Sequence, residues 1–270
     1  MKKGLKIAAF FLALALIIGV GCFANALVGN PVSKALVTYR AHQRLESVYS
    51  DLDLYIDRVG FSFKDGNYHV HVKSETSMDT YFSVSYDMLG RVGYDAYEDR
   101  VLRKVNTADR LTTAYRQMCD EVLQSPVFPY ECHIDYGDIE FTETEFLDKP
   151  HTLDYALLME DLEIDKLYDI RELGAKAGHL VIYIDDNEVS FRRAGEVLLS
   201  IRSFFDDSGV PFYAIDLVLT YPKPEDGGSR KEGRVDLHSF LYEDIYEEGI
   251  TQRVQLCAEK TEAYYASMDK

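Results

Sequence analysis

The first part of the chain is its longest apolar run. No charged residue lies between Ile7 and Val28, and Lys2, Lys3 and Lys6 precede that run. As a helix the segment would be roughly 33 Å long, about the thickness of the hydrocarbon core of a bilayer. Lysines that precede a membrane-spanning segment favour a cytoplasmic N-terminus. The pattern therefore predicts a transmembrane anchor over residues 1–29, in which the apolar positions include Ile7, Phe11, Leu14, Ile18 and Val28.

Two alternatives to an uncleaved anchor stay open at this point. Ala24-Asn25-Ala26 has the small-x-small form of a signal-peptidase site, although the run is longer than the core of a usual signal peptide. Cys22 could carry a lipid, but Gly19-Val20-Gly21 lacks the leucine expected three positions upstream. All three interpretations export the rest of the chain. We therefore expect a single-pass protein of the cell membrane with its body on the extracytoplasmic side.

A helix followed by a β-meander is predicted after the anchor. Asn30-Pro31 opens a segment with apolar residues at helical spacing, which extends to about Ser50. Alternating apolar and polar residues then predict strands at about 54–63, 68–73, 81–86 and 91–97, with a turn at Asp65-Gly66-Asn67. A second helix begins near Thr107, a natural N-cap, and ends at Ser125-Pro126. Residues 30–125 are therefore predicted to form one helix–meander–helix domain.

Residues 126–270 predict a second domain. Its expected elements are a strand or hairpin around Gly137, a short helix at about 169–177, strands at about 179–184, 211–221 and 235–242, and two amphipathic helices, the first at about 189–205 and the second from Ile250 to Tyr264. The predicted fold class is α+β, with an N-terminal transmembrane helix and two small domains, each a mostly antiparallel sheet packed with helices.

Composition narrows the classes of partner. Hydrophobic residues make up 47% and aromatic residues 13% of the chain, which indicates packed domains. The net charge of −17 argues against nucleic acid as a partner. The cysteines have no CxxC spacing, so no zinc site is indicated, and we expect no cofactor. A disulfide between Cys119 and Cys132 is permitted outside the cell, and Cys257 fits a small buried position.

Two long stretches of sequence resemble a known family. The first contains VGFSFKDGNYHVHVKSETSMDTYFSVSYDMLGRVGYDAYEDRV followed by NTADRL and YR, and the second contains GHLVIYIDDNEVSFRRAGEVLL and GVPFYAIDLVL. Together they are similar to the YfjL-like family of uncharacterised membrane-anchored proteins of Gram-positive bacteria. The resemblance implies a short transmembrane segment and two small α+β domains, and it supplies no functional residue. Arg193 departs from the acidic residue that would complete a capping box with Ser190.

Three clusters have metal-ligand chemistry but also simpler explanations. His69 and His71 lie on one face of a predicted strand and could bind a divalent metal, and His133-Ile134-Asp135 repeats this form. No third ligand follows from the spacing, so exposed histidines on a solvated face explain the pattern better. The run from Asp185 to Glu188 offers oxygen ligands for calcium, yet acidic residues before a helix are explained by capping. No metal site is therefore predicted.

The loops that flank the meander are the best candidate for a binding surface. Polar residues gather there in two groups: Glu75, Ser77, Asp79 and Thr80 in one loop, and Glu98, Asp99 and Arg100 before the second helix. Loops held by a sheet commonly carry binding sites. The same residues are also good turn and capping residues.

No catalytic motif is present. GxSxG, HExxH and glycine-rich phosphate loops are all absent from the sequence. The leading hypothesis is therefore an extracytoplasmic binding, sensing or accessory module that contacts the membrane through its N-terminal helix and an unknown surface protein or cell-envelope partner. The alternative is an extracytoplasmic hydrolase whose acid–base residues come from the two loops.

Overall fold

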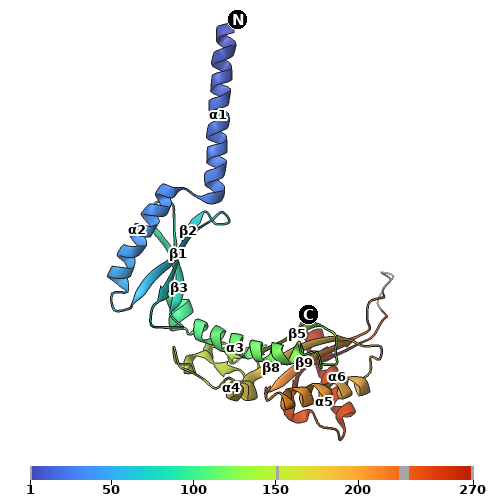
Figure 1. Cartoon of the computed structure of the whole chain (residues 1–270). Coiled ribbons are helices and arrows are strands. Elements are labelled where there is room, and N and C mark those ends of the chain that lie inside the picture. Colours follow the sequence, from blue (N-terminus) through green and yellow to red (C-terminus); the bar gives the residue numbers. More distant parts are fainter. Residues whose placement is uncertain (1, 150–151, 225–230, 269–270) are drawn as a thin grey trace. The chain divides into compact units, whose positions relative to one another are not determined.

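The chain forms two compact units, each with its own sheet and core (Figure 1). The computed structural model describes residues 2–149, 152–224 and 231–268, without the side chains of residues 2, 5, 22, 24, 26 and 268. The first unit comprises Met1–Thr107 with Glu163–Asp165, and the second comprises Ala108–Leu162 with Lys166–Lys270. The division falls within one helix, ahead of the boundary at residues 125 and 126 that the sequence predicts.

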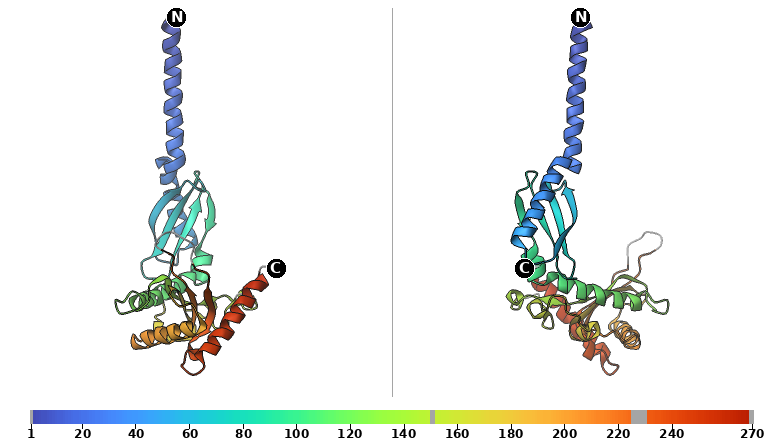
Figure 2. Two further views of the ribbon diagram at one scale, coloured as in Figure 1. Left: turned by 90° about the vertical axis from the view of Figure 1, so that its right-hand side faces the viewer. Right: turned by 60° about the vertical axis from the view of Figure 1, so that its left-hand side comes forward.

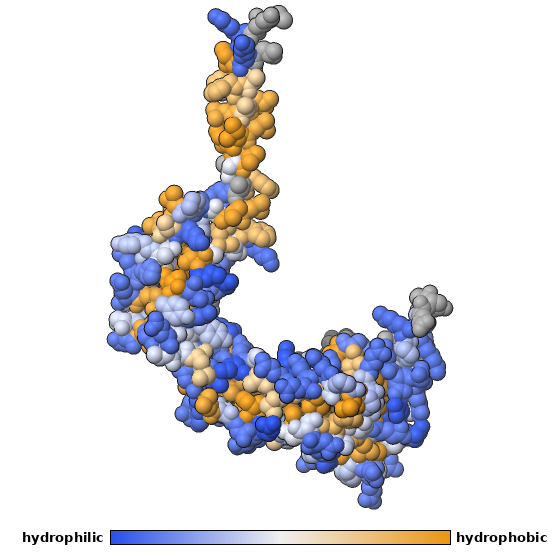
Figure 3. All heavy atoms as spheres, in the orientation of Figure 1, coloured by the Kyte–Doolittle hydropathy of each residue, from blue (hydrophilic) through white to orange (hydrophobic). Residues whose placement is uncertain are grey.

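Helix α1 (Lys2–Val28) opens the first unit, and exposed apolar side chains follow one another along it (Figure 3). Across the described residues, no helix is both long enough and apolar enough to cross a membrane. The Cys22 side chain, the site of possible lipidation, lies outside the described residues.

This finding corrects two predictions. The first is the transmembrane anchor of residues 1–29, with Ile7, Phe11, Leu14, Ile18 and Val28 as its apolar positions. The second is the single-pass location with the body on the extracytoplasmic side, which depended on that anchor. The α+β part of the predicted fold class holds, because both units combine sheets with helices.

The first unit is a four-stranded antiparallel meander with a helix on one face, as predicted. Helix α2 (Pro31–Val48) is followed by β1 (Leu54–Ser62), β2 (Asn67–Ser74), β3 (Tyr81–Tyr86) and β4 (Val92–Asp95), which pair in the order β1-β2-β3-β4. Figure 2 shows α2 lying along the sheet. The helix begins where the Asn30 side chain accepts a hydrogen bond from Ser33 N, 2.7 Å away, and Pro31 occupies its first turn.

Strand alternation explains the core of this unit. Tyr68, Val70 and Val72 of β2 pair with Tyr86, Val84 and Phe82 of β3, and all six are buried on the face that α2 covers. The intervening polar residues point to the opposite face, because successive side chains of a strand alternate. The Tyr68 hydroxyl accepts a hydrogen bond from Asn30 N at 2.7 Å and donates one to Asn30 O at 3.0 Å. These bonds attach the start of α2 to the sheet.

The second unit is built on a mixed four-stranded sheet in the order β10-β9-β8-β5. Strands β5 (Cys132–Ile139) and β10 (Arg234–Leu241) are antiparallel to the parallel central pair β8 (Gly178–Asp185) and β9 (Ala214–Thr220). Helix α5 (Phe191–Asp207) connects β8 to β9, which gives a β-α-β crossover. The remaining elements are α3 (Val105–Leu123), β6 (Phe141–Thr142), β7 (Leu157–Leu158), α4 (Ile170–Ala177) and α6 (Ile250–Met268), with short helical turns at Glu98–Leu102 (η1), Thr144–Phe146 (η2), Met159–Asp161 (η3) and Tyr242–Asp244 (η4).

One face of this sheet supports the main core. Leu180 and Ile182 of β8 and Ile215 and Leu217 of β9 are fully buried, in one cluster with residues of α3 and α5. A continuous apolar pattern in β8 and β9 is what a central parallel pair requires. Helix α6 packs against β10 and α5. The opposite face of the sheet carries polar residues, and these form the site described next.

Most predicted helices and strands of the second unit are confirmed, with two local differences. The region around Gly137 is one strand, β5, and no hairpin forms within it. Thr107 lies inside α3 and is buried, so it is not the N-cap. Ser190 does cap α5 by accepting a hydrogen bond from Arg193 N, and the Arg193 side chain pairs with Asp186 at 2.8 Å.

Candidate functional site

A row of four ionisable side chains crosses the polar face of the second sheet. Glu140 follows β5, His179 lies in β8, Asp216 in β9 and His238 in β10. The strands lie in the order β5-β8-β9-β10, so each strand contributes one member and neighbours in the row come from neighbouring strands. Three of these strands are otherwise rich in apolar residues. A row of charged and titratable groups in such a sheet needs partners to offset the cost of burial.

Asp216 is the centre of the row because an imidazole lies next to its carboxylate on each side. Its Oδ2 lies 2.9 Å from His238 Nδ1, and its Oδ1 accepts a 2.6 Å hydrogen bond from Ser239 N. His179 Nε2 lies 2.9 Å from Oδ1, without the straight approach of a hydrogen bond. A carboxylate with this many donors strongly favours its ionised form. Asp216 therefore sets the orientation of His238 and holds a negative charge between two imidazoles.

A bulge in β10 makes this arrangement possible. The pairing of β9 and β10 shifts between Leu237 and Phe240, so His238 and Ser239 together face Asp216. Ser239 has a φ of 50°, in the left-handed region that costs a non-glycine residue about 1 kcal/mol. Bulges often turn a side chain next to a functional site. The Ser239 hydroxyl is buried and has no hydrogen-bond partner among the described residues, so no base is placed to activate it as a nucleophile.

The other histidine of the row is buried. The His179 side chain is only 4% exposed. Its Nδ1 lies 2.6 Å from the Tyr155 hydroxyl and 3.7 Å from Glu140 Oε1. The Tyr155 ring packs on that of Tyr213, with centroids 4.6 Å apart. His179 is therefore an internal connection, while Glu140 and His238, at the two ends of the row, are partly exposed.

The environment moves three pKa values in this row. Burial acts to raise the pKa of Asp216, but the imidazoles of His179 and His238, each with a nitrogen 2.9 Å from the carboxylate, outweigh it and lower that pKa well below its usual value. The hydrogen bond to Asp216 raises the pKa of His238. Burial raises the pKa of Glu140. The pairing with Asp216 therefore favours the imidazolium form of His238 over the neutral form, compared with a free histidine.

The stability of the second unit should depend on pH through this pair. Asp216 has a lowered pKa, so its contribution is present above about pH 4 and is lost as the pH falls. His238 has a raised pKa, so its contribution is complete below about pH 6.5 and is lost as the pH rises through the folded-state value. We expect hydrogen exchange of β9 and β10 amides to show lower stability at about pH 8 than at about pH 5.5.

Asp216→Asn should flatten this pH dependence, because the paired charge is gone. Asp138→Asn is the matched control, since Asp138 also holds a cation, Arg116, on the same sheet but lies outside the His238 pair. A profile that stays steep in Asp216→Asn would contradict the assignment.

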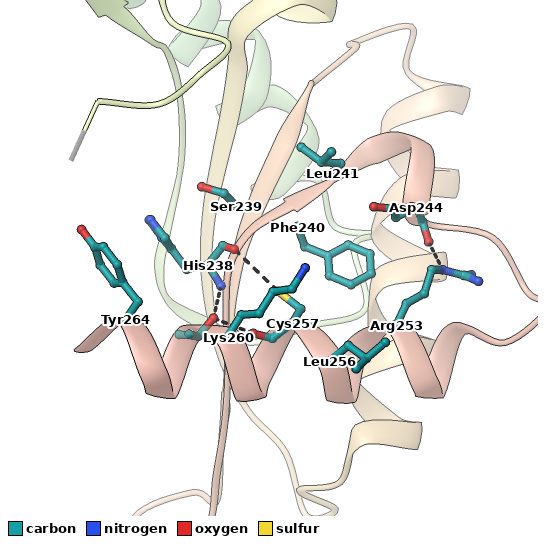
Figure 4. Close-up of a pocket in the computed structure, with 11 residues that line it drawn as sticks. His238, Ser239, Phe240, Leu241, Asp244, Arg253, Leu256, Cys257, Lys260 and Tyr264 are labelled. Carbon is teal, nitrogen blue, oxygen red and sulfur yellow. Dashed lines mark hydrogen bonds between the residues drawn. The ribbon is translucent and has the colours of Figure 1, made fainter. Parts of the chain in front are cut away.

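A groove of about 430 Å³ begins at His238 and runs between β10 and α6 (Figure 4). The His238 ring is stacked on Tyr264, with centroids 5.7 Å apart and an angle of 16°. Lys260 projects from α6 toward Phe240 in the middle of the groove, which Leu256 also lines. The backbone of His238 is also held in place, because its N–H group donates a hydrogen bond to Thr261 Oγ1 at 3.1 Å.

Arg253 lies at the far end of the groove, and its guanidinium group forms hydrogen bonds with the backbone. It donates to carbonyl oxygens of Asp244, Glu248 and Tyr246 at distances from 2.5 to 2.8 Å. These bonds fix the loop before α6. The groove therefore has a fixed polar end at Arg253, an apolar middle that Lys260 also lines, and His238 at its other end.

The first predicted loop is largely internal to the first unit. Asp79 is 1% exposed, and its Oδ2 accepts hydrogen bonds from Thr107 Oγ1 at 2.9 Å and from Asp165 N at 2.8 Å. Ser77 Oγ donates to Thr80 Oγ1 at 2.7 Å, and Thr80 is also buried. Glu75 is exposed and separate from this cluster. The structure thus brings together Ser77, Asp79 and Thr80, and a binding role for the loop stays a prediction.

The second predicted group lies in η1. Glu98 is exposed, and Asp99 accepts a hydrogen bond from the Tyr94 hydroxyl. Arg100 donates from Nε to Asn106 Oδ1 at 2.9 Å and lines a hollow on the first sheet. A binding role for Glu98 and Asp99 stays a prediction.

The metal and thiol candidates have local partners. His69 pairs with Asp65 at 2.9 Å, and Asp186 and Glu188 pair with Arg193 and Arg192. Within the described parts of the chain, no three histidine, cysteine or acidic side chains gather as a metal site. Cys119, Cys132 and Cys257 are free thiols, so the permitted disulfide is not formed. Burial raises the pKa of Cys119 and of Cys132 to about 12, which makes both unreactive.

Sequence reasoning missed the row because its members are far apart in the chain. His179, Asp216 and His238 each lie inside a segment that was assigned correctly as a strand. The one available signal was Asp216, a charged residue within the apolar segment PFYAIDLVLT. A charge in a buried strand requires a partner. The identity of that partner could not be read from spacing.

Comparisons with known proteins match both halves of the chain. A family model described as YfjL-like, N-terminal domain, matches residues 4–96, and one described as YfjL-like C-terminal domain matches residues 114–255. No curated protein and no solved structure matches the chain. The second match contains Glu140, His179, Asp216, His238 and Arg253, and it ends before Lys260.

Proposed function

The chain belongs to the YfjL-like family, and we propose that it is a ligand-binding module whose C-terminal unit takes an acidic ligand with an apolar body. The proposed site is the groove between β10 and α6. The observation that carries the proposal is the state of His238. Its Nδ1 is held by Asp216, while its Nε2 has no partner in the part of the chain that the structure describes.

The fixed imidazole is suited to binding an anion. Asp216 raises the pKa of His238, which extends to higher pH the range in which Nε2 carries a proton and can donate it in a hydrogen bond. Stacking on Tyr264 and the backbone bond to Thr261 limit the movement of the residue. Little side-chain entropy is then lost when a ligand binds. His238 supports recognition of a carboxylate at this end of the groove.

Lys260 and the apolar middle define the rest of the ligand. Lys260 is exposed and forms no ion pair with any described residue, so its ammonium group can approach the same acid group. Phe240 and Leu256 offer apolar surface next to it, and Leu256 is 57% exposed. Covering exposed apolar side chains favours binding by about 25 cal/mol per Å². An acid group attached to an apolar body of a few carbons therefore fits this groove.

Isothermal titration calorimetry of the full chain with 4-phenylbutyrate tests the proposal, with 4-phenylbutanol as the uncharged analogue. We expect the acid to bind and the alcohol to bind at least about tenfold more weakly, because each charge-assisted hydrogen bond contributes about 1.5 kcal/mol or more. Affinity for the acid should fall as the pH rises above about 6.5 and His238 loses its proton.

Lys260→Gln and Lys176→Gln form a matched pair for this experiment. Both lysines are exposed on helices of the second unit, but Lys176 pairs with Glu172 and lies outside the groove. Lys260→Gln should weaken binding of the acid by about tenfold, whereas Lys176→Gln should leave it unchanged. Equal affinities for the acid and the alcohol, or equal losses in the two variants, would refute the proposed site.

The rival function, an acid–base enzyme, has one observation in its favour. The pKa values of Glu140 and Asp216 are shifted in opposite directions, which is the arrangement that separates a general acid from a general base. The groove is lined by His238 and not by Glu140 or His179, and His179 is closed off by Tyr155. Binding is therefore the better-supported proposal. Turnover of a substrate that is abolished by Glu140→Gln would favour the enzyme.

A further inference from the structure

A second hollow lies on the first sheet, on the face opposite α2, and has a volume of about 440 Å³. The strand register explains its lining. Arg58 of β1, His71 of β2 and Ser83 of β3 are directly opposite one another, and Lys73 is paired with Tyr81 in the next row. Arg58, His71 and Ser83 thus form one line across three strands. Because Ser83 is small, the middle of the sheet is left open beside the longer side chains.

A bulge in β1 adds charge to this hollow. The pairing of β1 and β2 shifts between Ile56 and Arg58, which places Asp57 next to Arg58 at the edge of the same hollow. Asp57 pairs with Lys73 at 3.1 Å. Arg100 from η1 lines the opposite side. Three cations therefore surround the hollow, against one carboxylate, in a chain with a net charge of −17.

Arg58 is the distinctive member of this group. Its Nη2 lies 3.3 Å from His71 Nε2, and no acidic side chain among the residues described by the structure pairs with its guanidinium group. Burial, and next the charge of Arg58, lower the pKa of His71, while His69 and Lys73 act in the same direction and Asp57 opposes them. An anion bound at Arg58 would oppose this lowering of the His71 pKa. The hollow thus has an unsatisfied preference for negative charge.

We propose that this hollow, defined by Arg58, His71, Lys73, Tyr81, Ser83 and Arg100, binds the phosphate group of a small organic phosphate. A guanidinium group matches phosphate oxygens with two parallel hydrogen bonds, and the hydroxyl groups of Tyr81 and Ser83 are additional donors. Phosphate alone would fill only a small part of 440 Å³, so there is room for an organic portion beside the Tyr81 ring. This site is separate from the groove of the second unit.

Isothermal titration calorimetry of the full chain with phenyl phosphate tests the proposal, with inorganic phosphate and benzoate as comparisons. We expect phenyl phosphate to bind more tightly than inorganic phosphate and benzoate to bind most weakly. Arg58→Gln should weaken phenyl phosphate binding by about tenfold or more. Arg91→Gln removes the same charge from the same unit, but Arg91 pairs with Asp87 away from the hollow, so this variant should bind as the unchanged chain does.

Histidine resonances give a readout at the site itself. In the chain labelled at histidine Cε1, phenyl phosphate should raise the pKa of His71, because the bound anion offsets the charges of Arg58 and Lys73. His71→Gln assigns the resonance. Tighter binding of benzoate than of phenyl phosphate, equal losses in Arg58→Gln and Arg91→Gln, or an unchanged pKa of His71 at saturation would overturn the proposal. The lysine variants of the second unit should leave this binding unchanged, so the two proposals can fail separately.

Discussion

Asp79→Ala is expected to destabilise the first unit by about 3 kcal/mol. The Asp79 carboxylate is buried and accepts from Thr107 Oγ1 and from Asp165 N, at 2.9 and 2.8 Å. Alanine would leave both donors buried without their acceptor, and each such loss costs about 1–3 kcal/mol. The bond to Asp165 also attaches the segment Glu163–Asp165 to this unit. Its loss should release that segment as well.

Hydrogen exchange resolved by element is the measurement for this variant. Amides of β2 and β3 should exchange faster, while those of β8 and β9 should be unaffected, because the two sheets belong to different units. Asp79→Asn is the informative control. Both bonds go to Oδ2, and an amide oxygen in that position can accept both, so we expect a smaller effect than that of Asp79→Ala. Asp57→Ala removes an exposed carboxylate from the same unit and should cost little. An effect of Asp79→Ala no larger than that of Asp57→Ala would contradict the prediction.

Gly178→Ala is expected to destabilise the second unit by about 2 kcal/mol or more. Gly178 is the first residue of β8, directly after α4. A Cβ atom there would lie 2.5 Å from Gly174 O and 2.8 Å from Tyr115 Cζ. Tyr115 is fully buried and its hydroxyl donates to Pro211 O at 2.9 Å, so the ring cannot move aside without losing that bond. The added methyl group must therefore shift the backbone of α4.

The affected amides should be those of β8 and β9, in contrast to Asp79→Ala. Gly60→Ala is the matched control because a Cβ atom at Gly60 would have no neighbour within 4 Å. In a Tyr115→Phe background the cost of Gly178→Ala should shrink, since part of the clash involves the tyrosine hydroxyl. A cost that is the same in both backgrounds would place the strain elsewhere.

Local patterns in the sequence were sufficient for most secondary structure. The alternation in YHVHV places β2 correctly because only Tyr68, Val70 and Val72 can face the core formed with α2. Asn30-Pro31 marks the start of α2, and Gly209, with a φ of 64°, lies just after the end of α5. Each of these signals acts within a few residues. Around Gly137 the sequence left a strand and a hairpin open, because glycine in a strand resembles a turn until its neighbours are known, and the structure has the strand.

Gly137 also shows what long-range packing adds. A Cβ atom at this position would lie 3.0 Å from Leu180 Cδ2 and would collide with the Cys119 sulfur. Glycine is therefore needed because α3 packs closely against β5. The same packing keeps Cys119 as a buried free thiol. Neither contact can be inferred from the separation of these residues in the sequence.

The sequence by itself determined the two α+β domains and their family, because apolar periodicity and turn residues act over short distances along the chain. Tertiary structure alone decided which polar residues meet. Asp216 joins His179 and His238 only because β9 lies between β8 and β10, and Arg58 lies opposite His71 only through the register of β1 and β2. Strand order and register are set by packing of the whole core, so no local pattern encodes them.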